Sequence, residues 1–124
     1  MQKINRYYLQ GTIPILSDAD VTEFAVPETG HLVQMLVVNE VVLTTGDEDL
    51  TISTVVAAGD ASPDAVTGGV MVMPTSGTAV HKMHTLDIAE SASSQVVAGT
   101  TIHVANDGAC TSAGRAFITL TIHI

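Results

Sequence analysis

Five histidines include one pair, His81 and His84, whose spacing could bind a metal ion. Residues three positions apart lie together on a helix, but on a strand they point to opposite faces. No Glu or Cys stands at a spacing that completes a tetrahedral zinc site around the pair. The other three histidines, His31, His103 and His123, each stand alone in strand-like patterns. The sequence therefore favours loop, surface or half-buried structural roles for all five.

Two acidic segments, Asp47–Asp49 and Asp60–Asp64, could offer oxygen ligands to calcium. Calcium takes about six to eight oxygens from a shaped loop. Neither segment has the Asp-x-Asp-x-Asp-Gly pattern of a dedicated calcium loop. We expect both to be solvated turns. We expect the first to cap a hairpin between the apolar run that ends at Leu43 and the alternating residues that begin at Leu50.

Nucleophilic catalysis has one cysteine candidate, Cys110, in the small-residue segment 108–114. A Cys–His pair needs an oriented base and an oxyanion pocket, and nothing in the pattern brings His103 to the thiol. The sequence contains no Gly-x-Ser-x-Gly elbow, and no Lys follows the glycine pairs as it does in phosphate-binding loops. We therefore expect no catalytic residue, metal, cofactor or enzymatic activity. A calcium- or zinc-dependent hydrolase is the least unfavourable enzyme hypothesis.

The composition indicates a charge-poor domain with an aliphatic core. Of 124 residues, 46% are hydrophobic and only 3% aromatic, with no Trp, so the core must consist of Val, Ile, Leu, Met and Ala. A single domain of this length can bury such a core without disulfides. Charged residues make up 14%, against about 25% in an ordinary soluble domain. So few charges suggest that part of the surface is buried against other subunits.

The net charge of −9 argues against two classes of partner. Phosphate binding needs clustered Lys and Arg, and the basic residues are only Lys3, Arg6, Lys82 and Arg115. We therefore expect no binding to nucleic acid, and none to anionic membranes. No apolar stretch reaches the roughly 18 residues of a membrane-spanning helix, and the N-terminus lacks the apolar centre of a secretory signal. A lone cysteine fits synthesis in a reducing cytoplasm.

Strands must position these residues, because helical periodicity is nearly absent. Val, Thr and Ile recur in short runs separated by Gly, Pro, Asn and Asp turn signals. Eight such runs suit a jelly roll, which consists of two packed sheets. We expect an all-β, jelly-roll-like sandwich of about eight antiparallel strands over residues 12–124, preceded by an N-terminal arm over residues 1–11. The predicted strands are Thr12–Leu16, Val21–Val26, His31–Leu43, Leu50–Val56, Val70–Met73, Lys82–Ile88, Thr100–Ala105 and Ala116–Ile124.

Two of these strands indicate how their faces divide. The last one, Ala116–Ile124, alternates strictly between apolar residues and a more polar set, which predicts one face on the core and one partly wet. The run His31–Leu43 is apolar on both faces, so it should meet something outside its own core, most simply a neighbouring subunit. Its predicted faces are Val33, Met35, Val37, Val41 and Leu43 against Leu32, Leu36, Val38 and Val42.

Three ordered segments resemble small head proteins of tailed bacteriophages. They are VVNEVVLTTGDEDLTIS from Val37, TGGVMVMPTSGTAVHKM from Thr67 and SSQVVAGTTIHVANDGACTSAGRAFITLTIHI from Ser93. The familiar pattern is a strand ending near TTGD, a short strand before a Gly/Ser-rich stretch, a V-x-AGD-x-I-x-V-x-x-DG segment and a closing strand of alternating apolar residues. Here Thr100 replaces the usual Asp, and Glu40 stands where a Gly is expected.

The resemblance implies a decoration, or cement, protein. Such proteins are jelly-roll-like and commonly trimeric, and they clamp neighbouring major capsid subunits on the outside of the phage head. We therefore expect a homotrimer that contacts the major capsid protein on the virion exterior. An acidic protein suits the exterior of the head better than a position facing the DNA. The alternative is a head-fibre or tail-associated module that binds host glycans. Sugar sites usually present Trp or Tyr platforms, and this chain has no Trp and one adjacent pair, Tyr7 and Tyr8.

Overall fold

Alternation of inward apolar and outward polar side chains organises the chain into strands. The structure is a computed structural model and describes residues 5–55, 63–75 and 79–124. The one helical segment in these ranges is a short 3-10 turn, η1 (Ala92–Ser94). No described helix is long and apolar enough to cross a membrane. The strands are β1 (Arg6–Ile13), β2 (Asp20–Ala25), β3 (Gly30–Asn39), β4 (Glu48–Thr54), β5 (Asp64–Met73), β6 (Met83–Asp87), β7 (Gln95–Val96), β8 (Thr101–Asn106) and β9 (Ala116–His123).

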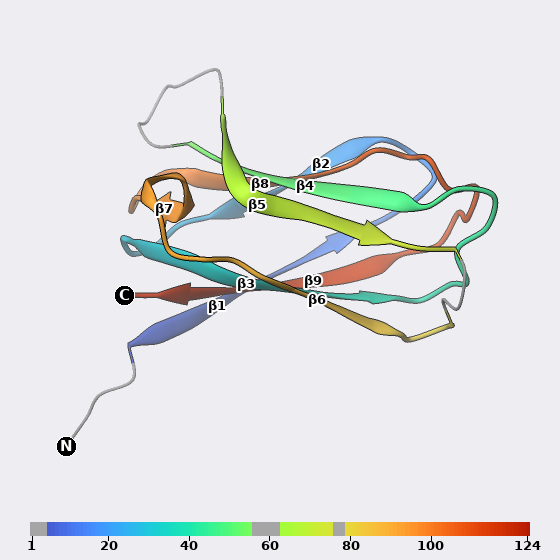
Figure 1. Cartoon of the computed structure of the whole chain (residues 1–124), viewed down its shortest axis with the longest axis horizontal. Helices are drawn as coiled ribbons and strands as arrows, with labels where there is room; N and C mark the ends of the chain where they lie inside the picture. The colour runs from blue at the N-terminus through green and yellow to red at the C-terminus, as the bar shows by residue number, and fades with distance from the viewer. Residues whose placement is uncertain (1–4, 56–62, 76–78) are drawn as a thin grey trace.

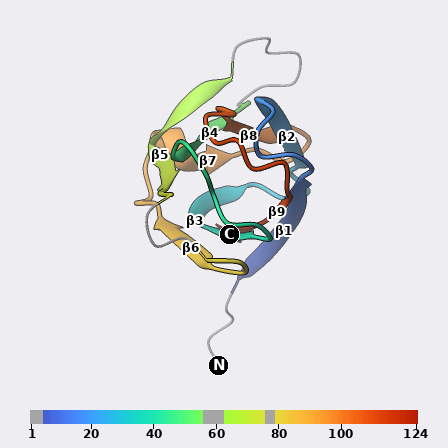
Figure 2. The same cartoon turned by 90° about the vertical axis from the view of Figure 1, so that its right-hand side faces the viewer.

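These strands form two antiparallel sheets that lie face to face (Figures 1 and 2). Sheet A has the order β1-β9-β3-β6, with the short β7 also paired to β3, and sheet B has the order β2-β8-β4-β5. The chain crosses between the sheets after β1, β2, β3, β5, β7 and β8. A five-stranded and a four-stranded antiparallel sheet connected in this way make a jelly roll. The predicted all-β, jelly-roll-like sandwich is therefore confirmed.

The core lies between the two sheets and is almost entirely aliphatic. In β9, Ala116, Ile118, Leu120 and Ile122 are at most 1% exposed, and they meet buried residues of sheet B such as Ile52. Close-packed aliphatic side chains of this kind supply most of the driving force for folding. The buried set also includes Leu32, Met35, Val37, Leu50, Met71, Met73, Ile102 and Val104.

The first strand corrects the prediction of an N-terminal arm over residues 1–11. β1 pairs with β9 along its whole length, from Arg6 opposite His123 to Ile13 opposite Ala116. Residues 6–11 are thus part of sheet A, while residues 1–4 lie outside the described ranges. Every second residue of β1 faces inward, and Tyr7 and Leu9 pack against the core. Polar residues between them hide this alternation in the sequence.

The third strand corrects the prediction of one long strand over His31–Leu43. β3 ends at Asn39, and the chain then crosses to sheet B. The pairing with β9 also shifts register between Leu32 and Gln34, which is a β-bulge. A bulge adds one residue to a strand and moves the following side chains to the other face.

The bulge changes the predicted faces of this strand. Leu32 lies buried on the same side as Met35 and Val37, whereas Leu36 and Val38 point outward and are half-buried. The strand is therefore wrapped by the core on one face only. The outward face is covered in part by its neighbours in the same sheet.

Other strand limits differ less from the predictions. The predicted strand Thr12–Leu16 already ends at Ile13. β5 begins at Asp64, well before the predicted Val70, because Gly68 and Gly69 continue it through a register shift. The short β7 was not predicted, since two residues carry no periodicity.

The close approach of β1 to the core allows a direct test of whether residues 6–11 belong to the sandwich. A Cβ at Gly11 would lie 2.6 Å from the Phe24 ring, and Phe24 is only 4% exposed. We expect Gly11→Ala to lower the free energy of unfolding by about 1–3 kcal/mol through overpacking, as measured by chemical denaturation. Gln10→Ala, an exposed neighbour, is the control. An unchanged stability in Gly11→Ala would mean that the segment is detached from the sandwich.

Candidate functional site

The acidic turn holds a buried carboxylate rather than an exposed ligand. Glu48, the first residue of β4, is fully buried. Its carboxylate accepts hydrogen bonds from the backbone N–H of Gly108 at 2.9 Å and of Cys110 at 3.1 Å, and from Asn106 Nδ2 at 3.1 Å. Three donors satisfy the carboxylate inside the protein. Glu48 therefore anchors the 106–110 loop and is not free to bind a cation.

This contact also corrects the expected hairpin at residues 47–49. β3 and β4 lie in different sheets, so the segment between them is a crossover. The Asp47 carboxylate accepts a hydrogen bond from the Thr75 N–H at 2.9 Å, and the Asp49 N–H donates to Asp107 at 3.1 Å. The acidic turn therefore joins three segments at one end of the sandwich. In the other acidic segment, which we expected to be a solvated turn, Asp64 is exposed and residues 60–62 lie outside the described ranges.

The histidine pair converges on a buried asparagine instead of a metal. Asn39 is fully buried, and its Nδ2 donates to the carbonyls of Val41 and Ala79 at 2.6 and 2.9 Å. Its Oδ1 lies 3.0 Å from His84 Nε2, so this nitrogen carries the proton. His81 has an exposed side chain, and its backbone N–H donates to the Asn39 carbonyl at 2.7 Å. Asn39 thus ties β6 to the end of β3.

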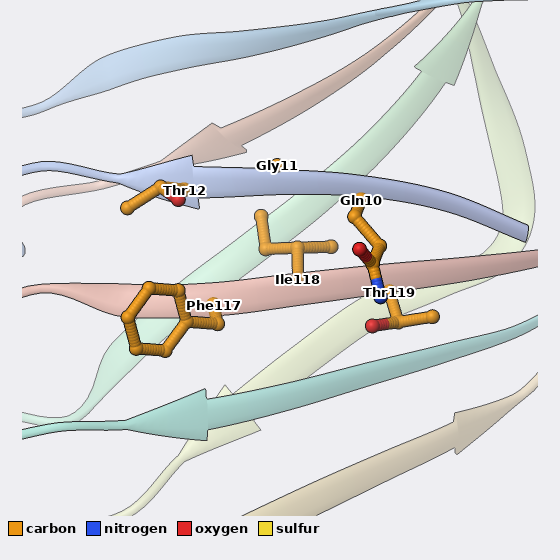
Figure 3. A pocket seen from close by; sticks show the side chains of 6 residues that line it. All are labelled: Gln10, Gly11, Thr12, Phe117, Ile118 and Thr119. Carbon is orange, nitrogen blue, oxygen red and sulfur yellow. The ribbon is translucent and has the colours of Figure 1, made fainter.

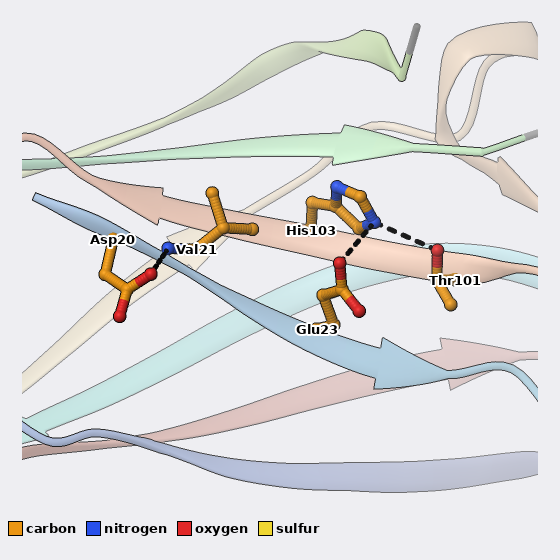
Figure 4. Close-up of polar contacts among 5 residues, drawn as sticks. All are labelled: Asp20, Val21, Glu23, Thr101 and His103. Atoms are coloured by element: carbon orange, nitrogen blue, oxygen red, sulfur yellow. Dashed lines mark hydrogen bonds and ion pairs between the residues drawn. The ribbon is translucent and has the colours of Figure 1, made fainter. Parts of the chain in front are cut away.

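The candidate nucleophile and base are on different parts of the fold. Cys110 is 2% exposed in the core, and burial raises the pKa of its thiol, which opposes thiolate formation. His103 points outward from sheet B, with its Nε2 3.0 Å from Thr101 Oγ1 and 3.5 Å from Glu23 Oε1 (Figure 4). These residues do not form a Cys–His pair.

The remaining histidines face each other across two strands. His31 of β3 pairs with His123 of β9, and His123 Nδ1 lies 3.8 Å from Glu90 Oε1. Within residues 5–55, 63–75 and 79–124, no group of three or more His, Cys, Asp or Glu residues is placed to hold a metal ion.

A broad surface whose central residues carry no charge is the feature most suited to a function. We call it the sheet A face; it is the outer side of sheet A away from the core. The register aligns Phe117 of β9 with Val38 of β3, and Val38 with Met83 of β6. Met83 is 60% exposed and Phe117 39%. The central residues of the face are Gln10, Thr12, Leu36, Val38, Met83, Thr85, Phe117 and Thr119.

The sheet A face is hollowed between β1 and β9. A shallow pocket of about 320 Å³ is lined there by Gln10, Gly11, Thr12, Phe117, Ile118 and Thr119. Figure 3 shows that the Phe117 ring stands beside Thr12, with Gln10 and Thr119 at the other end of the pocket. The lining carries no ionisable side chain, so it offers shape and apolar area but no acid–base chemistry.

Charged groups stand at the edge of this face. Arg115 precedes β9, and its guanidinium lies 5.6 Å from the centre of the Phe117 ring, within the range of a cation–π contact. The same side chain donates two hydrogen bonds to Glu40, from Nε at 2.8 Å and from Nη2 at 3.3 Å. These contacts hold the Phe117 end of the face in one conformation.

The two sheets differ in charge. The strands of sheet B contain Asp20, Glu23, Glu48, Asp49 and Asp64 and no Lys or Arg. The strands of sheet A contain one basic and one acidic residue, Arg6 and Asp87. The net charge of the chain is thus concentrated away from the sheet A face. Composition alone could not show which face carries the negative charge, because the topology determines which strands share a sheet.

No protein-family model matches the chain, and no curated protein matches it.

Removing the Glu48 carboxylate should destabilise the fold. In Glu48→Ala, the N–H groups of Gly108 and Cys110 lose their acceptor, whereas Asn106 Nδ2 keeps the carbonyls of Leu16 and Asp18. Each unsatisfied buried donor costs about 1–3 kcal/mol. We expect the free energy of unfolding to fall by about 3 kcal/mol or more, measured by urea denaturation. Asp49→Asn, one position along, should stay within about 0.5 kcal/mol of the wild type. Equal effects of the two substitutions would refute the anchoring role.

His84 should make the stability depend on pH. Burial of the ring, and then the charge of Lys82, lower the pKa of His84 below the ordinary 6.5. Because the folded state disfavours the proton, the contribution of His84 is complete above pH 6.5 and is lost as the pH falls through the lowered value. We expect the melting temperature of His84→Gln to fall less between pH 7.5 and pH 5 than that of the wild type.

Glutamine is the informative replacement because its amide can still donate to Asn39 without titrating. His81→Gln is the control, since the His81 side chain is exposed, and it should retain the pH dependence of the wild type. If His84→Gln and the wild type respond to acid in parallel, His84 is not the group responsible.

Proposed function

We propose that this chain is a decoration protein that binds the outside of a phage head as a homotrimer and stabilises contacts between major capsid subunits. The observation that carries the proposal is a jelly roll with one broad sheet face whose central residues are uncharged and partly apolar. The three ordered segments that resemble phage head proteins add to it. A role in binding also agrees with the uses that the candidate chemical residues have in the fold. Glu48 and Asn39 hold loops, and Cys110 is in the core.

The proposed mechanism is mechanical. DNA packed in a head presses outward on the shell, and an added oligomer that spans neighbouring subunits increases the interface area that must be broken. Burial of apolar area supplies about 25 cal/mol per Å². The outward acidic residues of sheet B, Glu23 and Asp49, suit a surface that remains in solvent on the exterior of the particle.

The glycan-binding alternative is less well supported by the position of the tyrosines. Tyr7 packs against the core, and its hydroxyl donates to the Glu28 carbonyl. Tyr8 points to the other side of sheet A and is 57% exposed. Successive residues on a strand point to opposite faces, so the two rings do not form a shared platform for a sugar.

The proposal is tested by adding the purified chain to expanded phage heads that lack their decoration protein. We expect the chain to co-sediment with the heads, and we expect loaded heads to release their DNA at a higher temperature than bare heads. Unexpanded shells are the control, since a protein that reinforces the expanded lattice should not bind them. Failure to bind expanded heads, together with binding on a glycan array, would replace this function by the attachment role.

A further inference from the structure

We infer that copies of this chain associate through the sheet A face. This inference deepens the proposed function and rests on its homo-oligomeric assembly, which by itself leaves the contact surface unassigned. The face has the composition of an interface centre. Phe117, Val38 and Met83 form one cross-strand row, with Leu36 in the next row, and interface centres are enriched in aromatic residues and Met and depleted of charge.

The edge of the face has the composition of an interface rim. Arg115 is stacked over Phe117 and bound to Glu40, so its side chain is already ordered before any partner arrives. Arg is among the residues enriched at interfaces, and ordering it in advance lowers the entropy lost on association. Asp87, held by Gln34 at 3.0 Å, occupies the opposite edge on β6.

The distribution of charge indicates that the partner of the sheet A face is a second copy of this chain. A basic partner would be drawn to the acidic strands of sheet B, whereas the central residues of the sheet A face are uncharged. Two copies, each with a net charge of −9, repel each other least when their acidic sheets point apart. Like charges placed opposite one another across an interface cost several kcal/mol. The sheet A face is therefore the surface through which identical acidic chains can approach.

The area of the sheet A face can be compared with the area that a stable interface buries. The strands β1, β9, β3 and β6 have 8, 8, 10 and 5 residues. With a spacing of about 4.8 Å and about 3.3 Å per residue, they span roughly 19 by 26 Å, or about 500 Å² before side-chain relief. A stable interface buries about 800 Å² on each partner. The backbone area of the whole face is below this value before side-chain relief is added, so the contact must use the whole face, including the row of Tyr8 and Gln34.

The test is sedimentation velocity of the full chain at micromolar concentration. Met83→Glu replaces a side chain that is 60% exposed, so the core is left intact, and it adds a negative charge at the β6 end of the Phe117 row in the proposed contact. We expect the wild type to sediment as an oligomer, and we expect Met83→Glu to weaken its self-association at least tenfold. Thr85→Glu, exposed on the same strand and face, should have the same effect.

The matched control is Val70→Glu, which adds the same charge to a valine that is 51% exposed on the outer side of sheet B. It should sediment as the wild type does, and circular dichroism verifies the fold of all variants. The inference is overturned if both sheet A variants still associate fully, or if Val70→Glu dissociates. A monomeric wild type also overturns it. If that monomer still binds heads, the decoration role survives, and loss of head binding in Met83→Glu alone would make the shell the occupant.

Discussion

The pairing of β9 with β1 on one side and β3 on the other is the constraint on which the rest of the structure depends. β9 lies inside sheet A, and its inward residues Ile118, Leu120 and Ile122 are at most 1% exposed. A strand alternates its faces with a period of two, so a slip of one residue would exchange all buried and outward positions. The register that buries these isoleucines and leucine is therefore the register that turns Phe117 outward. The core and the sheet A face are two results of one pairing.

Two buried polar side chains fix the crossover from sheet A to sheet B. Asn39 ends β3 and holds the turn before β6, while Glu48 begins β4 and holds the loop before β9. Both are fully buried, and burial of such groups is tolerated only when their hydrogen bonds are made. An acidic turn and a nearby histidine can thus look like a chemical site in the sequence although their polar groups are used to join strands.

Periodicity predicted the parts of the fold that depend on local pattern. The alternation of β9 predicts a strand because its inward residues are all aliphatic. For most other strands, the predicted limits differ from the observed ones by a few residues. β1 was missed because Tyr7 and Gly11 are inward residues that do not read as apolar core. The bulge after Leu32 was not visible, since an extra residue in an all-apolar run leaves the pattern unchanged. Glu48 was unpredictable because its donors, Gly108 and Cys110, come from a loop about 60 residues later.

The topology shows how the few charges of this chain are distributed between the two sheets. An apolar face exposed on a solitary domain invites indiscriminate association, and open sheet edges add to that risk. Here the strands of sheet B carry acidic residues without basic ones, so that side disfavours contact with another copy, whereas the row from Phe117 to Met83 carries no charge. Repulsion on one side and apolar area on the other leave few ways for identical molecules to meet. The acidity that argues against nucleic acid as a partner therefore also disfavours self-association through sheet B.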